Sequence, residues 1–203
     1  MHVSALETKP LDSRDVRGNL GPASVVVQAR PGTDWIHDRW QAASNMHGKQ
    51  IPGEHWIQLE FEDTDVVPDK IVLDWETAYA DEYVLEASSK SFSVESNRRG
   101  NHPSREEEKE EEGEEGPWVL FDGRNQQDVA TMRSVKKSGK SPGVDKPMPL
   151  HVIHEIRLSS ASSRNKAFRF LRLHILKSVT GWGVSLWQFD VYGYRADEVQ
   201  TSR

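Results

Sequence analysis

The chain has 203 residues, a length that suits one domain with large loops or tails. Hydrophobic residues make up 35% and cysteine is absent, so we expect a modest core and exclude disulfides, zinc–thiolate sites and cysteine nucleophiles. The net charge of −6 equals the charge of residues 105–115 alone, where eight Glu outweigh Arg105 and Lys109; the neutral remainder argues against a broad nucleic-acid-binding face.

Alternation of apolar and polar residues predicts a series of strands. In HWIQLEFE (55–62), Ile57, Leu59 and Phe61 fall on one face and polar residues on the other, the pattern of a half-buried strand. Further strands are predicted, in chain order, at KIVLDW (70–75, after the turn-like DVVPD, 65–69), EYVLEAS (82–88), WVLFDG (118–123), LHVIHEIRL (150–158), FRFLRLHIL (168–176) and SLWQFDVYGY (185–194). At least seven short strands without helical periodicity between them predict an all-β antiparallel sandwich or barrel.

The last predicted strand is one of the most apolar. Unbroken alternation places Trp187, Phe189 and Val191 on one face and Leu186 and Tyr192 on the other. We expect this strand to close the sandwich with Phe189 in the core.

Two polar segments interrupt the strand series as long insertions. Residues 96–117 carry the acidic run, and residues 123–149 are Gly-, Pro- and Ser-containing with a basic stretch, RSVKKSGKSPGVDK. The two could attract each other or remain independent solvated loops, and the acidic run is of the kind that stays disordered or binds a basic partner. The predicted organisation is an N-terminal extension at 1–21, a sandwich at 22–195 and a tail at 196–203.

Membrane and export signals are absent from the sequence. There is no apolar run of 18 residues, and the first ten residues lack the apolar centre of a signal peptide, although a signal removed earlier would leave the same sequence. No Asn-x-Ser/Thr sequon occurs either. The compartment is left open: extracellular if a signal was removed, intracellular if there was none.

Several strand segments resemble a known family. DRW, HWIQLEF, PDKIVLDWETAYADEYVLEAS, FRFLRLHI and GWGVSLWQFDVYG occur in the order found in discoidin, or coagulation factor 5/8 type C, domains, and look closest to carbohydrate-binding modules of family 32. The resemblance spans about residues 22–194 without the two insertions. It implies a galactose-binding-like jelly roll that binds ligands through loops at one end of the sandwich.

The loop before the last strand lies, by this resemblance, at the ligand end. An exposed Trp182 could stack on the apolar face of a sugar, and Gly181 and Gly183 permit the backbone angles that would present it. The alternative is that Trp182 plugs the end of the core.

The early segment TDWIHDRWQAASNMHG (33–48) is expected at the same end, because sugar sites in these modules combine aromatic rings with His, Arg, Asn or Glu. Trp40 matches a family core residue, and Arg39 beside it is expected to be a structural partner. The predicted ligand residues are Trp35, His37, Asn45, His47 and Trp182. Each of them alone also has an ordinary structural explanation.

Many relatives hold a structural calcium ion in this early loop. Calcium takes six to eight oxygen ligands. Here Asp34 and Asp38 are the candidate metal ligands, but the usual acidic run is replaced by TDWIHD, and Gln188 stands at the matching Glu position of the last strand. These departures remove or displace charge, so no cofactor is expected and calcium is the one metal left open.

Catalytic motifs are missing. His151 and His154 lie three apart on a predicted strand and point to opposite faces, so they do not share an ion, and His154 is expected to be a buried or edge histidine. Glu76 in DWETAYA matches a family hallmark with an architectural role. No hydrolase, zincin, phosphate-loop or dinucleotide motif is present, so the chain is predicted not to be an enzyme.

Three functions follow as hypotheses. The first is a non-catalytic carbohydrate-binding, lectin-like module that recognises a galactose-like or amino-sugar glycan. The second is a protein-interaction subunit of a larger intracellular assembly, with partners on the charged loops. The third is lipid binding through Trp35 and Trp182 as apolar spikes, which lack the accompanying basic cluster.

Overall fold

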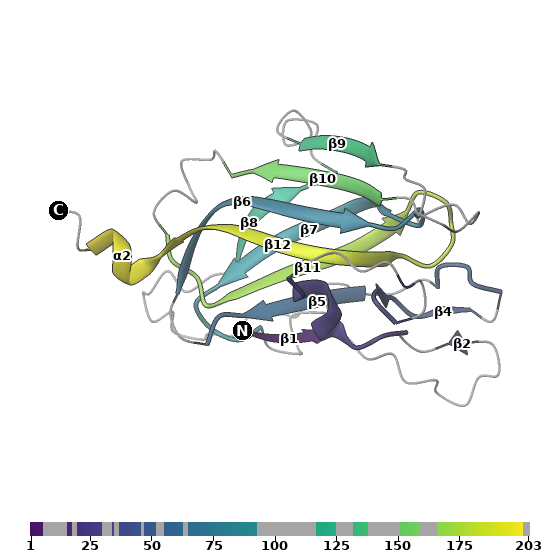
Figure 1. Cartoon of the computed structure of the whole chain (residues 1–203), viewed down its shortest axis with the longest axis horizontal. Helices are drawn as coiled ribbons and strands as arrows, with labels where there is room; N and C mark the ends of the chain where they lie inside the picture. The colour runs from purple at the N-terminus through teal and green to yellow at the C-terminus, as the bar shows by residue number, and fades with distance from the viewer. Residues whose placement is uncertain are drawn as a thin grey trace, which may run out of the picture.

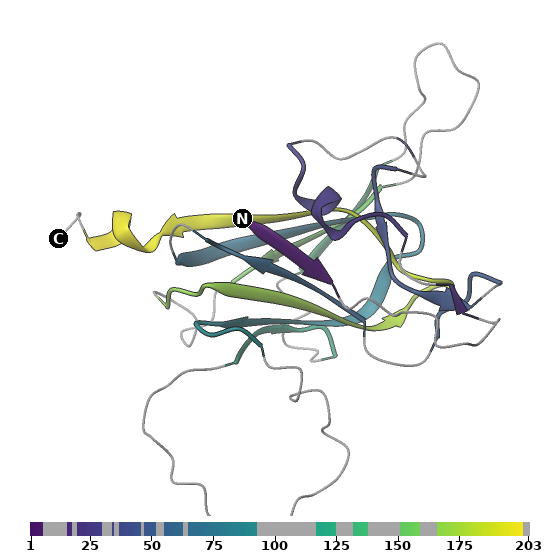
Figure 2. The same cartoon turned by 90° about the horizontal axis from the view of Figure 1, so that it is seen from below.

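A computed structural model describes most of the sandwich. The described residues are 1–5, 16–17, 20–29, 34, 37–45, 47–51, 55–62, 65–92, 117–124, 132–137, 151–158 and 166–200. Within them two five-stranded antiparallel sheets pack face to face, and Figures 1 and 2 show the two layers. The predicted all-β antiparallel sandwich is confirmed.

The sheets interleave strands from distant parts of the chain. The first sheet has the order β1 (His2–Ala5), β5 (His55–Glu60), β11 (Phe170–Ser178), β7 (Ala80–Ser88) and β8 (Trp118–Asp122). The second has the order β3 (Trp40–Gln41), β12 (Ser185–Arg195), β6 (Val66–Trp75), β10 (His151–Arg157) and β9 (Met132–Lys137). A small ribbon of β2 (Val16–Arg17) and β4 (Ser44–Asn45), the 3₁₀ turn η1 (Ala23–Val27) and the helix α2 (Ala196–Gln200) complete the described elements.

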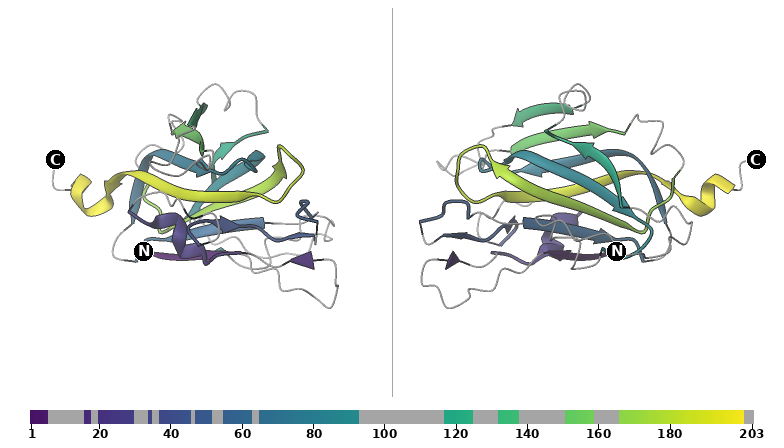
Figure 3. Two further views of the ribbon diagram at one scale, coloured as in Figure 1. Left: turned by 45° about the vertical axis from the view of Figure 1, so that its right-hand side comes forward. Right: turned by 180° about the vertical axis from the view of Figure 1, so that it is seen from behind.

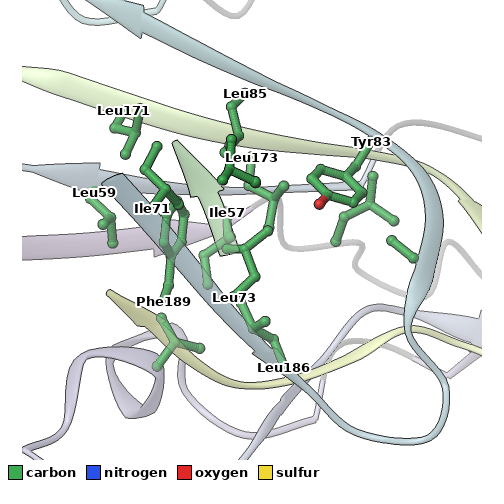
Figure 4. Packing of buried hydrophobic residues seen from close by; sticks show 14 of the residues in the cluster. Ile57, Leu59, Ile71, Leu73, Tyr83, Leu85, Leu171, Leu173, Leu186 and Phe189 are labelled. Atoms are coloured by element: carbon green, nitrogen blue, oxygen red, sulfur yellow. The ribbon is translucent and has the colours of Figure 1, made fainter. Parts of the chain in front are cut away.

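The core lies between the two sheets. Alternate residues of each central strand point inward, so Ile57 and Leu59 of β5 meet Ile71 and Leu73 of β6 in one fully buried cluster (Figure 4). Burying one such side chain contributes about 1.5–3 kcal/mol, so this cluster dominates the stability of the sandwich.

Strand β6 is longer than predicted. The segment DVVPD is not a turn, because β6 begins at Val66 and pairs with β12 through Pro68. Proline lacks a backbone N–H, and β12 shows a register shift at Gly193, which stands opposite Pro68. A Cβ on Gly193 would lie 2.1 Å from the Val67 carbonyl oxygen, so this close approach requires glycine.

Two strands lie in segments for which no strand was predicted, the N-terminal extension and the basic insertion. Strand β1 falls within the predicted extension at 1–21 and pairs with β5 along its whole length. Strand β9 falls within the basic insertion at 123–149 and pairs with β10, so this part of the insertion is an edge strand and not a loop. Residues 96–116 of the acidic insertion lie outside the described residues.

The predicted alternation of the last strand is wrong at its start. A β-bulge between Leu186 and Gln188 inserts an extra residue, so Leu186 and Phe189 both enter the core cluster. Trp187 is also fully buried but stacks on His151, with ring centroids 5.3 Å apart, outside that cluster. The closing role of the strand and the burial of Phe189 are confirmed.

The outer face of the first sheet holds a buried polar contact. Gln58 was predicted on the solvent face of β5, but it is buried there because its Oε1 accepts hydrogen bonds from Nε and Nη2 of Arg172 at 3.1 and 2.8 Å. The Arg172 guanidinium lies between the rings of Trp56 and Phe92, 4.3 and 4.2 Å from their centroids. These two ring contacts help to cover the buried guanidinium.

The two ends of the sandwich differ. The loop between β11 and β12 lies beside β4 at one end, while α2 extends from the other, as Figures 1 and 2 show and the turned views of Figure 3 repeat. Among the described residues, no helix has the length and apolar character needed to cross a bilayer.

Candidate functional site

A pocket of about 370 Å³ opens beside Trp182. It is lined by Arg39, Gln41, Gly48, Glu76, Thr77, Ala78, Thr180, Trp182, Gly183 and Ser185. These residues come from β3 and the residue before it, the turn after β4, the β6–β7 turn, the β11–β12 loop and the first residue of β12. The pocket therefore lies at the loop end of the sandwich, where a rigid scaffold holds several segments together.

Trp182 is an exposed wall of this pocket. Its side chain is 53% exposed, so the alternative that it plugs the end of the core is wrong. The Gly183 N–H donates to the Gly48 carbonyl oxygen at 2.7 Å, and the Gln50 N–H donates to the Gly181 carbonyl oxygen at 2.9 Å. These bonds attach the Trp182 backbone to the neighbouring hairpin, whose described residues are 44–45 and 47–50.

The glycines around the indole have separate roles. Gly48 has φ +82°, and a Cβ there would lie 3.0 Å from Cε3 and 3.2 Å from Cζ3 of Trp182. Gly181 has φ +72°, but a Cβ there would meet open space. Gly48 therefore lets the hairpin approach the indole closely, whereas Gly181 serves the turn of the backbone.

An ion pair lies along one side of the pocket. Arg39 Nη1 donates to Ser185 Oγ at 2.7 Å and lies 3.7 Å from Glu76 Oε2. Burial lowers the pKa of Arg39 from the usual arginine value, and the nearby Glu76 carboxylate opposes that shift. The predicted structural role of Arg39 is observed, and the same side chain also lines the pocket.

Glu76 holds the β6–β7 turn. Its Oε1 accepts a hydrogen bond from the Thr77 hydroxyl, and its Oε2 accepts one from the Ala78 N–H at 3.0 Å. The Glu76 N–H donates to the Ser185 carbonyl oxygen at 3.0 Å, which ties this turn to β12. The architectural role expected for Glu76 is observed.

Uncharged polar groups complete the lining. The Thr180 hydroxyl accepts a hydrogen bond from the Trp182 N–H at 3.2 Å. Gln41 Nε2 lies against Gly183, where a Cβ would come within 3.3 Å of it. The Gln41 carboxamide has no hydrogen-bond partner among the described residues, so it can offer both donors and an acceptor to a ligand.

In the early loop, the carboxylates of Asp34 and Asp38 accept hydrogen bonds from backbone N–H groups of the same loop. The Asp34 N–H donates to Asp38 Oδ2 at 3.0 Å, and the His37 N–H donates to Asp34 Oδ1 at 3.2 Å. His37 is exposed and is not part of the pocket lining. Trp35 lies outside the described residues.

Asn45 shapes the hairpin that supports Trp182. Its Oδ1 accepts hydrogen bonds from the His47 and Lys49 N–H groups, at 3.0 and 2.8 Å. His47 is exposed in this turn, next to Gly48 of the pocket. Of the predicted ligand residues that the structure describes, Trp182 alone lines the pocket, and the ligand role of the others stays a prediction.

Candidate metal ligands do not gather in the described part of the chain. It contains no group of three or more His, Cys, Asp or Glu side chains that could hold an ion. Gln188, at the expected calcium-ligand position, instead donates from Nε2 to the Gln28 carbonyl oxygen at 3.2 Å and to Asp190 Oδ1 at 2.8 Å. The calcium role of Asp34 and Asp38 stays a prediction.

His151 and His154 point to different surroundings, as predicted. His154 is buried, and its Nδ1 shares a 3.0 Å hydrogen bond with the Tyr83 hydroxyl. Burial lowers the pKa of His154 to about 4, so the ring is neutral at pH 7. His151 Nδ1 instead lies 2.9 Å from Asp74 Oδ1.

Three residues that line the pocket were not predicted from the sequence: Gln41, Thr77 and Thr180. A signal for Gln41 was present, because it follows the buried Trp40, and neighbours on a strand face opposite sides. No comparable local pattern marks Thr77 or Thr180, which reach the pocket through turns joined by long-range pairing.

Comparisons with known proteins give low similarity. No family model matches the chain, and no curated protein matches it. Similar solved structures include chitosan-binding modules 1 and 2 of a chitosanase/glucanase from Paenibacillus sp. IK-5, the second in complex with chitotriose. Each is 19% identical with a TM-score of 0.40 and covers 76% of this chain, and the match spans 76% and 77% of the respective module.

A structure of the β-galactosidase of Streptococcus pneumoniae is also similar, with 12% identity and a TM-score of 0.45 over 95% of this chain and 90% of that one. With TM-scores below 0.5 and identities below 20%, we infer no shared ligand from these likenesses. The resemblance to discoidin domains and to family 32 modules stays a prediction.

Proposed function

We propose that this chain is a non-catalytic, lectin-like carbohydrate-binding module that holds a galactose-like or amino-sugar residue in the pocket beside Trp182. The observation that carries the proposal is an exposed indole forming one wall of a pocket whose other walls present hydrogen-bonding side chains. A pyranose has this dual character, because its C–H face is apolar and its rim carries hydroxyls. Indole stacking and hydroxyl hydrogen bonds can then act together.

The other predicted ligand residues keep a place in the proposal. His47 stands next to Gly48 at the pocket edge and would contact the remainder of a longer glycan. Asn45 acts by holding the hairpin, since its Oδ1 is engaged by two backbone N–H groups. Trp35 and His37 remain proposed contacts from the early loop.

Binding of purified protein to a broad glycan array, with Trp182→Ala beside the wild type, tests the proposal. Tyr194→Ala is the matched control, because Tyr194 is also an exposed aromatic side chain but lies on β12 near α2. We expect selective glycan binding that falls by about tenfold or more in Trp182→Ala and is unchanged in Tyr194→Ala. No glycan bound by the wild type contradicts the proposal, and binding retained by Trp182→Ala contradicts the site.

The alternative function is that of a protein-interaction subunit. Leu176 and Val179 are exposed on the segment that leads to Trp182, so exposed apolar side chains also occur outside the pocket lining. A protein partner would cover these residues together. Co-purification from the native source would favour this alternative by yielding a stoichiometric partner that Val179→Asp releases.

A further inference from the structure

The pocket contains opposite charges that already face each other. In the part of the chain that the structure describes, Arg39 and Glu76 are the charged residues of the lining, and their formal charges cancel. The remaining lining residues carry hydroxyls, a carboxamide, an indole or no polar side chain. A ligand entering this pocket therefore meets a site with no net formal charge.

Neither charged side chain faces the pocket without a partner. A carboxylate ligand that approached Arg39 would also approach Glu76, because the two groups lie 3.7 Å apart, and would be repelled by it. An ammonium ligand would need Glu76, which is 2% exposed and already accepts hydrogen bonds from Thr77 and Ala78. Each kind of charged ligand would lose hydration without gaining an uncompensated counter-charge.

The side chain of Gln41, unlike those of Arg39 and Glu76, is uncharged and available to a ligand. Its backbone N–H and carbonyl oxygen are both bonded to Leu20, which fixes the strand position. Its side-chain carboxamide lines the pocket against Gly183 and has no partner among the described residues. A carboxamide both donates and accepts, which matches a hydroxyl or an acetamido group better than a charged group.

We infer that the pocket selects uncharged sugars, either a neutral hexose or an N-acetylated amino sugar, over free amino sugars and uronic acids, and that Gln41 is the specificity-determining side chain. This inference rests on the proposed carbohydrate binding and narrows it. The ammonium form of an amino sugar is disfavoured, while its acetylated form is accepted.

Titration with two matched series of methyl glycosides tests the inference. The galacto series is galactose, N-acetylgalactosamine, galactosamine and galacturonic acid, and the gluco series is its counterpart. At pH 7 we expect the neutral and N-acetylated members of at least one series to bind, with the two charged members weaker by about tenfold or more. Binding of the neutral members should change by less than about twofold between low and high salt, because no ion pair forms.

Variants of Gln41 identify the selecting residue. Gln41→Glu gives the pocket a net negative charge, so we expect weaker binding of neutral sugars and a shift of preference toward galactosamine or glucosamine. Gln28→Glu is the matched control, since Gln28 is exposed outside the pocket lining, and it should leave the profile unchanged. Melting curves of both variants check that the sandwich is intact.

The outcomes separate the two proposals. Binding with equal or greater affinity for a charged member overturns the selection inference and leaves carbohydrate binding in place. An unchanged profile in folded Gln41→Glu overturns the role of Gln41. The absence of binding to every member of both series overturns the proposed function, and the inference with it.

Discussion

Replacing Leu186 by Ala tests the β-bulge that turns the start of β12. Unbroken alternation would place Leu186 on the same face as Tyr194, which is 61% exposed. The bulge instead brings Leu186 into the core with Phe189, and both are almost fully buried. The stability cost of Leu186→Ala therefore reports directly on the register of the closing strand.

The expected magnitude follows from this burial. Leu186→Ala should lower the free energy of unfolding by about 2–5 kcal/mol and Phe189→Ala by about 3–5 kcal/mol, because each leaves a cavity between the sheets. In a chain of this size, 1 kcal/mol shifts the melting temperature by about 2–4 °C, so Leu186→Ala should melt about 4–20 °C below the wild type. Tyr194→Ala, an exposed change on the same strand, should stay within about 0.5 kcal/mol.

Urea unfolding followed by circular dichroism measures these differences, with thermal melting as a second assay. If Leu186→Ala were as stable as Tyr194→Ala while Phe189→Ala lost several kcal/mol, β12 would run without a bulge, and the placement of Leu186 would be wrong. If Phe189→Ala also melted like the wild type, the strand would not close the core at all.

Three further changes probe the charged and glycine positions. Burial lowers the pKa of His154 to about 4, so on acidification the unfolded state takes up a proton at a higher pH than the folded state does. The free energy of unfolding should therefore fall by up to about 1.4 kcal/mol per pH unit from pH 6.5 toward 4 and then level off. Urea unfolding of the wild type and of His154→Gln measures this, and a difference between the two that does not change with pH would refute it. Arg172→Lys should cost about 1–3 kcal/mol in the same assay, because lysine cannot reproduce the stacked, two-pronged contact, and an unchanged midpoint would contradict that role. Gly48→Ala and Gly181→Ala both place alanine at positive φ, which costs about 1–2 kcal/mol of backbone strain, but only the Cβ of Gly48→Ala contacts the Trp182 ring. The tryptophan emission spectrum and the glycan affinity should therefore change in Gly48→Ala alone. Equal effects of the two variants would argue against the close packing of Gly48 on Trp182.

The regular strands were predictable from the sequence because their signal is local. In β5, the side chains of Ile57 and Leu59 alternate with polar ones, and this period matches the pleat of a half-buried strand. The buried Trp40 and the turn-holding Glu76 also followed from the family resemblance. The alternation in β5 lies within one strand, so neighbouring residues carry that information, whereas Trp40 and Glu76 were expected from the resemblance.

The departures depend on partners that are far away in the chain. The bulge at Leu186 and the tolerance of Pro68 in β6 are set by the register between β6 and β12, more than 100 residues apart in sequence. The sequence of the edge strand β9 resembles a basic loop, because an edge strand pairs on one side only and needs few apolar residues. Local periodicity does not encode such pairings.

The pocket was missed for the same reason, since its walls are assembled by pairing and not by a motif. Gln41, Thr77 and Thr180 stand in three segments that carry no shared pattern. The antiparallel pairing of β12 with β3 and β6 helps to bring those segments together. Trp182 was predicted because it stands between two glycines before the last strand, and because the family resemblance places that loop at the ligand end.

The way Trp182 is held bears on how binding would work. Its loop is bonded to the hairpin through Gly48 and Gln50, and the Gln50 side chain is itself fixed by the Leu176 carbonyl oxygen and the Ser178 N–H. A wall positioned by backbone bonds loses little conformational freedom when a ligand arrives, so more of the stacking energy remains as affinity. Weakening this support by Gln50→Ala should therefore lower glycan affinity while every side chain of the pocket lining is unchanged. Equal affinity of Gln50→Ala and wild type would show that the bonds of the Gln50 side chain do not help to hold the Trp182 loop for binding.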